Sequence, residues 1–375
     1  MRICKMMNRM ISEGCHRRRP KCPEEHRIVA HQSRLAEDKA EYGETGLNDQ
    51  APLRMASLFS GIGGFDLGFE NAGFRTTIQC EINKYCLEVL DKHWPTVPKW
   101  KNIKELTNAN IPLSDVWAAG FPCQDVSLAR RGPRAGLKGA RSGLFYEFAR
   151  LVGEGRPRVF VLENVHGLLH SHKGRDFEAV IRTLAELGYS VGWRVLNSRF
   201  FGVPQSRQRV YIVGCYRDRR GPGQILFEPE RRKGNLEEGQ PTGSKSVSPF
   251  KRVIGDSGGK GPVVQSVAYC LCACSARHTG TDWSRTYVSY PMRGMVRRPT
   301  PRECEGIMGF PLGWTLAPKG KLADEDLDSL RYHALGNAVT PPVAAWLASR
   351  VRAYLFEPRE GPRAKTLEME VISCE

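Results

Sequence analysis

Short apolar runs along the chain alternate with stretches of helical periodicity. The runs that predict strands are, in chain order, Ala56 to Phe59, Thr77 to Cys80, Val116 to Ala119, Val159 to Leu162, Val191 to Leu196 and Val210 to Val213. The stretches that predict helices are Phe65 to Ala72, Lys84 to His93, Gly143 to Val152 and Asp176 to Leu187. Because strands alternate with helices, we expect an α/β fold with a parallel sheet covered by helices, complete by about Tyr216.

The same patterns divide the chain into five regions. Residues 1–54 are polar, charged and aperiodic, which predicts a disordered N-terminal extension. Residues 55–215 hold the predicted sheet, and residues 216–300 are expected to form a second, smaller domain. Residues 301–357 resume helical patterns and are expected to return to the first domain, and residues 358–375 form a tail.

Residues 216–300 differ from the sheet region in pattern and in charge. They are rich in glycine, proline, serine and arginine, with strand-like pieces only at Ser266 to Cys272 and Thr286 to Val288. From Tyr216 on, this region carries 15 basic and 7 acidic residues. Two helical patterns follow, over Arg302 to Met308 and over Pro342 to Tyr354. A basic region of loops and short strands is expected to face a polyanion such as nucleic acid.

Composition adds three expectations. The chain has 375 residues, 41% of them apolar, and a formal net charge of +16, which allows a large core and favours a polyanionic partner. Apolar runs such as Val159 to Leu162 are far shorter than a bilayer requires, and no signal-like segment precedes them, so we expect a cytoplasmic protein without a membrane partner. Twelve cysteines in that compartment are expected to be free thiols.

Two groups of residues contain side chains that could bind a metal ion. Cys270, Cys272 and Cys274 alternate along a strand-like stretch, which fits a pleated face better than a metal site. A looser set lies in the N-terminal extension and contains no paired CxxC; its members are Cys15, Cys22, His26 and His31. We therefore predict no metal site.

A glycine-rich turn follows the first strand, where backbone must approach a ligand closely. It runs from Ser57 to Gly64 and leads into a helix. Asp66 occupies the third glycine position of a dinucleotide fingerprint, which argues against a nicotinamide cofactor. Glu81 ends the next strand, where a carboxylate can accept hydrogen bonds from a ribose diol.

Four further elements carry groups suited to catalysis. Cys123 follows an apolar strand at the carboxyl edge of the sheet, where open α/β folds bind ligands, and Glu163 ends another strand at the same edge. Arg207 and Arg209 occupy alternate positions before a further strand and therefore share one face. Near the C-terminus, residues 336–339 (Gly-Asn-Ala-Val) predict a second tight backbone loop.

Together, in this order, these motifs resemble those of the cytosine-5 DNA methyltransferases of bacterial or phage single-chain type, from about Met55 to Leu355. The matching motifs are Phe59–Gly64, Pro122-Cys123-Gln124, Glu163-Asn164-Val165, Gln205–Arg209, Arg297–Pro311 and Gly336–Val339. The resemblance implies a Rossmann-like sheet that binds S-adenosyl-methionine, and a target recognition domain in residues 216–300.

The resemblance also assigns residue roles. It implies that Cys123 is the nucleophile, that Glu163 is the acid that binds the base, and that Arg207 and Arg209 support it. The residues expected to contact S-adenosyl-methionine are Phe59, Ser60, Gly61, Gly63, Gly64, Glu81, Ile82, Asn102, Pro122, Leu144, Asn337 and Val339. Asn102 stands where the family usually has an acidic residue. The residues expected to contact DNA are Gln124, Ser127, Arg130, Arg131 and Gln205.

The function implied is methyl transfer from S-adenosyl-methionine to C5 of a cytosine flipped out of a specific duplex DNA sequence, through a covalent bond from Cys123 to C6. A tRNA cytosine-5 methyltransferase of the same fold and a catalytically inactive DNA-binding paralogue are the alternatives. Duplex DNA is the expected partner, and a cognate restriction endonuclease acting on the same site is a second candidate. We expect a monomer.

Overall fold

The structure is a computed structural model that describes residues 52–122, 143–227, 267–273, 286–290, 295–316 and 324–357. All of these residues belong to one compact unit. The expectations for residues 1–51, which include the disordered extension and the loose set of cysteines and histidines, lie outside the described residues. The glycine- and arginine-rich loop at Ser127 to Ser142 also lies outside them.

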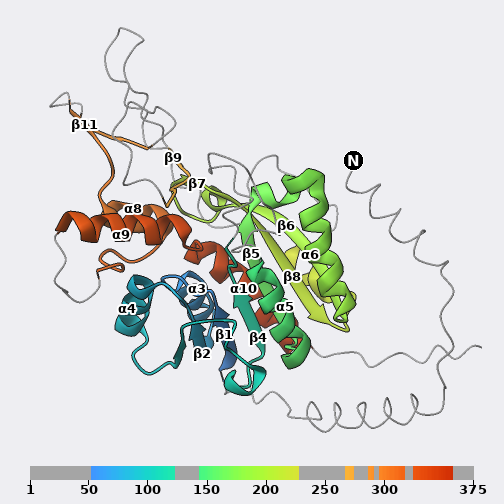
Figure 1. The fold of residues 1–375 in the computed structure, drawn as a ribbon. Coiled ribbons are helices and arrows are strands. Elements are labelled where there is room, and N and C mark those ends of the chain that lie inside the picture. The colour runs from blue at the N-terminus through green and yellow to red at the C-terminus, as the bar shows by residue number, and fades with distance from the viewer. Residues whose placement is uncertain are drawn as a thin grey trace, which may run out of the picture. The chain divides into compact units, whose positions relative to one another are not determined.

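A seven-stranded sheet with the order β3-β2-β1-β4-β5-β8-β6 forms the centre of the unit (Figure 1). Its strands are β1 (Leu53–Leu58), β2 (Phe74–Cys80), β3 (Lys99–Trp100), β4 (Val116–Ala119), β5 (Val159–Val165), β6 (Tyr189–Asn197) and β8 (Gln208–Tyr216). The first strand begins two residues before the boundary expected at Met55, and Leu53 and Met55 are both buried. All six predicted strands are present.

The expectation of an all-parallel sheet is wrong for one strand. Strands β1 to β5 pair in parallel, whereas β8 runs antiparallel to both β5 and β6. Only residues 198–207 separate β6 from β8. A parallel connection needs a crossover of about a dozen residues or more, usually a helix, so this short link returns the chain in the opposite direction. The amino end of β8 therefore lies at the carboxyl edge of the other strands.

Side chains of the central strands alternate between two cores. On one side, Trp117 and Phe160 pack with the helices α5 (Leu144–Gly155) and α6 (Arg175–Glu186). On the other side, Val116 and Val159 pack with a different group of helices. These are α3 (Gly64–Asn71), α7 (Gly221–Leu226) and α10 (Pro341–Phe356). Strands buried on both faces with helices on both sides form the expected three-layer α/β architecture (Figure 1).

A third core joins the sheet domain to the C-terminal motifs. It contains Ile62, Val89 of α4 (Lys84–His93), Met308 of α8 (Pro301–Met308) and Leu335 of α9 (Asp324–Asn337). Thr300 and Glu303 cap α8 through a reciprocal capping box, which explains why this helix starts after Thr300. Residues of the C-terminal helices α8 and α9 thus pack on α4.

Parts of the chain beyond Tyr216 differ from the expectation. Helix α7 was not predicted, and it packs against α10 and β6, so residues of the sheet domain continue past Tyr216 to Leu226. Two short pairings follow within the described residues. They are the parallel pair β7 (Gln205–Ser206) and β9 (Ala268–Tyr269), and the antiparallel pair β10 (Val288–Tyr290) and β11 (Met295–Arg297).

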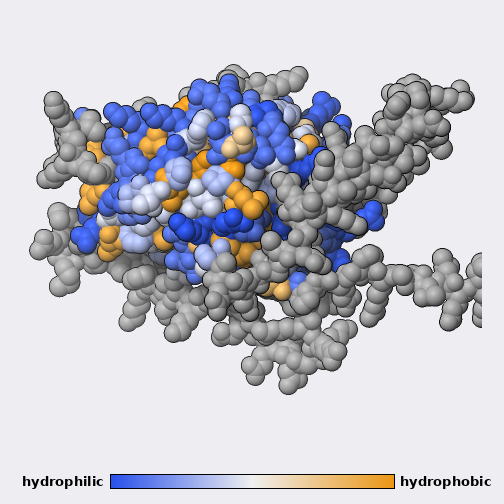
Figure 2. Space-filling view, turned by 90° about the horizontal axis from the view of Figure 1, so that it is seen from below, coloured by the Kyte–Doolittle hydropathy of each residue, from blue (hydrophilic) through white to orange (hydrophobic). Residues whose placement is uncertain are grey.

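On the side drawn in Figure 2, apolar side chains lie in separate small patches among hydrophilic ones. None of the described helices combines the length and the apolar character that crossing a membrane requires.

Candidate active site

A cavity of about 710 Å³ opens at the carboxyl edge of the sheet. Its wall is formed by the residues that follow β1, β2, β3 and β4, by the last residues of β5, by the start of β8 and by the end of α9. The lining residues are Phe59, Gly61, Cys80 to Asn83, Lys101 to Lys104, Gly120 to Pro122, Leu144, Glu163 to Val165, Arg207, Arg209, His333, Gly336 and Asn337. Open α/β sheets bind their ligands at this edge.

Main-chain amides hold one carboxylate in the cavity. Glu81 Oε2 accepts a hydrogen bond from the Gly61 amide, and Oε1 accepts one from the Asn83 amide, both at 2.8 Å. Gly61 has φ of 57°, a left-handed conformation that glycine adopts without strain. Burial raises the pKa of Glu81, and the two amides oppose this. The carboxylate is therefore fixed in orientation and keeps lone pairs for a ligand.

The next two glycines of the turn serve packing instead. A Cβ on Gly63 would lie 2.4 Å from the Trp94 ring, and one on Gly64 would lie 2.3 Å from the Val339 carbonyl oxygen. Ser60 is buried, and its hydroxyl donates to the Ser57 carbonyl oxygen at 3.1 Å. Ser60, Gly63, Gly64 and Val339 were expected to contact a cofactor, but they are not among the residues that line the cavity.

The remaining predicted cofactor residues do line it. Ile82 has 75% of its surface exposed, an unusual value for isoleucine, and presents an apolar surface beside Glu81. Asn102 donates to Glu105 Oε1 at 2.7 Å and accepts from the Lys104 amide at 3.1 Å. Phe59, Pro122, Leu144 and Asn337 complete the predicted set found in the wall.

Side-chain charges gather at the opposite end of the cavity. Arg209 Nε lies 3.1 Å from Glu163 Oε1, and both side chains are largely buried. The pairing of β5 with β8 explains this proximity, because Val165 is opposite Arg209 and Glu163 is opposite Tyr211. Burial raises the pKa of Glu163, and the positive charges of Arg209 and Arg207 oppose that shift. Glu163 thus holds its proton more tightly than an exposed glutamate does.

Arg207 connects three segments of backbone. Its Nη1 donates to the Leu271 carbonyl oxygen at 3.0 Å, and its Nη2 donates to those of Gly336 and Ala338 at 3.1 and 2.8 Å. Gly336 belongs to the last turn of α9, so the tight loop expected at residues 336–339 is instead a helix end. Arg207 was predicted as catalytic support, and most of its hydrogen bonds position main chain.

Residues 53–248 match the family described as C-5 cytosine-specific DNA methylase, slightly more than half of the chain. The chain belongs to this family. It is 30% identical to the Type II methyltransferase M.HhaI of Haemophilus parahaemolyticus over 82% of this chain and 96% of that protein. It is 36% identical to M.NlaIV of Neisseria lactamica, where the match covers 53% of this chain and 49%, about half, of the relative's length.

Solved structures agree on the fold. The S. pombe Dnmt2 methyltransferase superimposes with a TM-score of 0.58 and 20% identity, covering 81% of this chain and 99% of that one. A putative DNA modification methyltransferase encoded within an E. coli prophage gives a TM-score of 0.52 and 18% identity, covering 81% of this chain and 99% of that one. The sheet is thus that of the S-adenosyl-methionine-dependent cytosine-5 methyltransferases.

Of the five residues predicted to contact DNA, the structure describes only Gln205. In this member of the methylase family, Gln205 is fully buried. Its Nε2 donates to the Ile307 carbonyl oxygen at 3.3 Å, and its Oε1 accepts from the Leu271 amide at 3.0 Å. It therefore braces the segment 267–273 instead of facing a ligand. The predicted nucleophile Cys123 and the predicted DNA contacts Gln124, Ser127, Arg130 and Arg131 lie outside the described residues.

Some residues in the methylase cavity were not predicted. Asn164 donates to the Phe121 carbonyl oxygen at 3.2 Å and so fixes the chain just before Pro122. Its place directly after Glu163 was the available signal. His333 lines the cavity one helical turn before Asn337, but α9 itself was not predicted. Among the described residues, no group of three or more histidine, cysteine or acidic side chains is arranged to hold a metal ion.

Proposed function

We propose that this protein transfers a methyl group from S-adenosyl-methionine to C5 of a flipped-out cytosine in a specific duplex DNA sequence. The observation that carries the proposal is the buried pair of Glu163 and Arg209, 3.1 Å apart, in the same cavity as Glu81 and Pro122. One end of this cavity suits a nucleoside cofactor, and the other suits a polar heterocycle. The family membership of the chain supports the same reaction.

The residues present fit the cofactor. Glu81 is fixed by two amides and can accept from a ribose diol, while Ile82 and Phe59 offer apolar surface to a base. The cavity volume of about 710 Å³ lies within the usual range for such ligands. When bound, S-adenosyl-methionine supplies an electrophilic methyl group on its sulfonium.

Cys123 is proposed as the nucleophile. Pro122 lines the cavity, and Asn164 holds the backbone just before it, so Cys123 directly follows a residue of the cavity wall. C5 of cytosine is too weak a nucleophile to accept a methyl group unaided. A bond from the Cys123 thiolate to C6 turns C5 into an enamine carbon, which can then attack the methyl group. Loss of the C5 proton and elimination of the thiolate complete the turnover.

Glu163 is proposed to bind N3 and the exocyclic amine of the cytosine. Because burial raises its pKa, the carboxyl group can hold a proton and donate it toward N3 as negative charge develops there. Arg209 fixes the orientation of the carboxyl through the 3.1 Å contact. The pair thus stabilises the ring during attack at C6.

Such an attack requires the base to leave the stack, because C6 must be approached from above the ring plane. Extrusion costs a few kcal/mol. We propose that the loop at Ser127 to Ser142 closes over the extruded base, with Arg130 and Arg131 near phosphates. Residues 216–300 are proposed as the target recognition domain. We further propose that the protein acts as a cytoplasmic monomer, and that an endonuclease acting on the same site is its functional counterpart, as the names of its Type II relatives suggest.

Transfer of a labelled methyl group tests the proposal. Purified protein is incubated with tritiated S-adenosyl-methionine and either unmethylated duplex DNA or tRNA, and the labelled nucleoside is identified. We expect the label to appear as 5-methyldeoxycytidine in the DNA and to be absent from the tRNA. Label in tRNA alone would establish the RNA substrate instead, and label in neither would indicate an inactive paralogue.

A further inference from the structure

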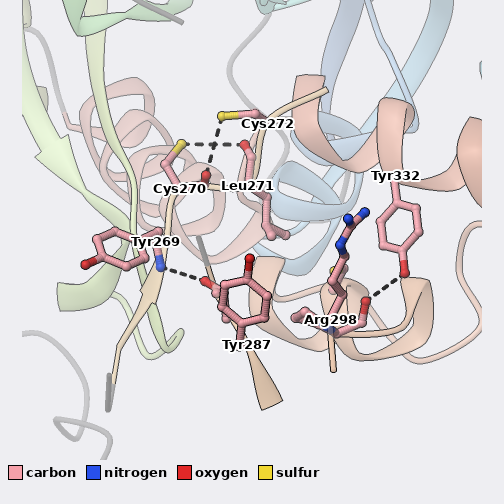
Figure 3. Close-up of a pocket in the computed structure, with 10 residues that line it drawn as sticks. Tyr269, Cys270, Leu271, Cys272, Tyr287, Arg298 and Tyr332 are labelled. Carbon is pink, nitrogen blue, oxygen red and sulfur yellow. Dashed lines mark hydrogen bonds between the residues drawn. The ribbon is translucent and has the colours of Figure 1, made fainter. Parts of the chain in front are cut away.

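A second cavity, of about 110 Å³, contains three cysteines in its wall (Figure 3). Cys270 and Cys272 belong to the segment 267–273, and Cys304 belongs to α8. Cys270 also touches the active site, because its sulfur contacts Arg207 and Arg209, which line the larger cavity. The sulfur lines the smaller cavity and the two arginines line the larger one, so these contacts lie between the two cavities.

The contacts of Cys270 favour a thiolate. Its sulfur lies 3.6 Å from Arg207 Nη1 and 3.8 Å from Arg209 Nη2. These two guanidinium groups face a single carboxyl group, Glu163, so the buried cluster has at least one positive charge in excess. Arg207 Nε is buried without a hydrogen-bond partner. A negative sulfur would balance this charge.

The Cys272 thiol donates to the Cys270 carbonyl oxygen at 3.5 Å, and its side chain also forms a hydrogen bond with the Cys270 sulfur. This bond, followed by the charges of Arg207 and Arg209, lowers the pKa of Cys270 to about 4, although burial opposes the shift. The Leu271 carbonyl oxygen, 3.5 Å from the sulfur, favours the neutral thiol. That oxygen already accepts from Arg207 Nη1 at 3.0 Å, so its influence is the weaker one.

At three other described cysteines, Cys80, Cys86 and Cys304, burial is the largest influence on the pKa. Burial raises the pKa of Cys80 to about 12, and it raises that of Cys304 to about 12 as well. Such thiols are protonated at neutral pH and react slowly. Cys270 is only partly buried, and the adjoining cavity of about 110 Å³ has room for a molecule somewhat larger than water.

We propose that Cys270 is a modification site for peroxides, with Cys272 as its resolving thiol. The Cys270 thiolate attacks one oxygen of hydrogen peroxide, the O–O bond breaks, and Cys270 sulfenic acid and hydroxide form. The Cys272 sulfur then attacks the sulfenic sulfur, water leaves with the Cys272 proton, and a disulfide joins the two residues. Peroxide is reduced by two electrons in total, and low-molecular-weight thiols reverse the reaction.

The consequence for catalysis rests on the proposed function. A disulfide is neutral, so oxidation leaves the excess positive charge of Arg207 and Arg209 next to Glu163. That charge lowers the pKa of the Glu163 carboxyl, because the Cys270 thiolate had helped to raise it. Glu163 then loses the proton that it donates toward N3, and methyl transfer falls until the disulfide is reduced.

Thiol mapping of the full chain tests the site without using methyl transfer. The protein is labelled with iodoacetamide at about pH 6, digested and analysed by mass spectrometry. We expect Cys270 to be labelled about tenfold faster than Cys304, or more. Equal rates would overturn the proposal. If Cys270 labels fast in a protein that methylates nothing, the proposed function fails alone; if methylation proceeds while Cys270 labels slowly, this inference fails alone.

A second arm uses hydrogen peroxide and three variants. In the parent, the peptide that holds Cys270 and Cys272 should lose the mass of two hydrogen atoms, which reports a disulfide. Cys272→Ser should instead accumulate a sulfenic acid at Cys270, which a dimedone reagent traps. Cys304→Ser is the matched control and should behave as the parent. Cys270→Ser should form neither product and should lose less methyl transfer than the parent after the same treatment. Equal oxidation of Cys304 and Cys270, or a disulfide in Cys270→Ser that joins Cys272 elsewhere, would contradict the assignment.

Discussion

The two ends of the active-site cavity are built in different ways. At the cofactor end, a single carboxylate, Glu81, is held by the main-chain amides of Gly61 and Asn83. At the base end, Glu163 is held by the side chain of Arg209 from an antiparallel neighbour strand. Burial raises the pKa of both carboxyls; main-chain amides oppose the shift at Glu81, and the charges of Arg209 and Arg207 oppose it at Glu163.

This difference suits the two ends to different tasks, cofactor binding at the first and the chemical step at the second. Amides fixed by a backbone turn give a rigid, uncharged frame that suits a ligand bound in one pose. Guanidinium groups beside a carboxyl that can hold a proton give an electrostatic environment that responds when charge develops on a substrate. Substitutions at the first end should therefore change affinity, and substitutions at the second should change rate or stability.

The largest expected effect is at the base end. Glu163→Gln keeps the shape of the side chain but cannot deliver a proton toward N3. We expect kcat to fall by about 10² to 10³-fold, while S-adenosyl-methionine binding measured by calorimetry stays within about twofold. Glu154→Gln, at a half-exposed surface pair with Arg150, is the control and should retain activity. A tenfold loss of cofactor affinity in Glu163→Gln would show that the two ends are not separate.

Arg207→Lys tests whether this arginine serves structure. A lysine cannot reach the carbonyl oxygens of Leu271, Gly336 and Ala338 together, so buried acceptors lose partners. We expect the free energy of unfolding in urea to fall by about 2–4 kcal/mol. Arg182→Lys, at an exposed side chain paired with Glu178, should change it by less than about 0.5 kcal/mol. Full stability with lost activity would instead assign Arg207 to catalysis.

Asp66 lies behind the proposed cofactor end, and no cation of the described residues is among the influences on its pKa. Burial raises its pKa to about 6 from 3.8, although Gln79 and Ser57 donate hydrogen bonds to it. The folded state holds this proton more tightly than the unfolded state does. The protonated carboxyl therefore contributes fully to the free energy of unfolding below about pH 4, and this contribution is lost as pH rises through 6. The loss amounts to about 3 kcal/mol at pH 7.

Asp66→Asn should remove that loss, since an amide can accept from Gln79 and donate to the Ser57 hydroxyl. Urea unfolding of parent and variant at pH 4 and pH 7 measures it. Between pH 4 and pH 7, the free energy of unfolding of the variant should rise by about 3 kcal/mol relative to that of the parent. If the difference in unfolding free energy between parent and variant were the same at pH 4 and pH 7, Asp66 would have an ordinary pKa.

Glu81→Gln should have the smallest of these effects. The glutamine amide nitrogen would face the Gly61 or Asn83 amide, donor against donor, and the charge that assists ribose binding would be lost. We expect the Kd for S-adenosyl-methionine to rise about tenfold with kcat at saturation nearly unchanged. Asn102→Asp, in the same wall, should bind at least as tightly as the parent. A fall in kcat for Glu81→Gln without weaker binding would contradict the division between the ends.

Motifs next to strand ends were predictable from sequence, and features set by tertiary packing were not. Glu81, Glu163 and Pro122 follow apolar runs, so their place at one edge could be inferred before any coordinates. The reversal of β8 was hidden because an apolar run carries no direction. The buried role of Gln205 depends on α8, which lies about a hundred residues later in the chain.

The glycines show the same limit. Their spacing predicted a close approach, but not its partner. For Gly63 the partner is the Trp94 ring, and for Gly64 it is the Val339 carbonyl oxygen. Helix α9 was missed because Gly336 and Asn337 are typical loop residues, whereas here they form its last turn.

Covalent trapping tests the central claim most directly. Duplex DNA that contains 5-fluorocytosine at the target is incubated with the protein and S-adenosyl-methionine, because fluorine at C5 blocks the final elimination. We predict a protein–DNA adduct that survives denaturing electrophoresis and maps to Cys123, with none from Cys123→Ser. An adduct formed equally well by the serine variant would contradict the account.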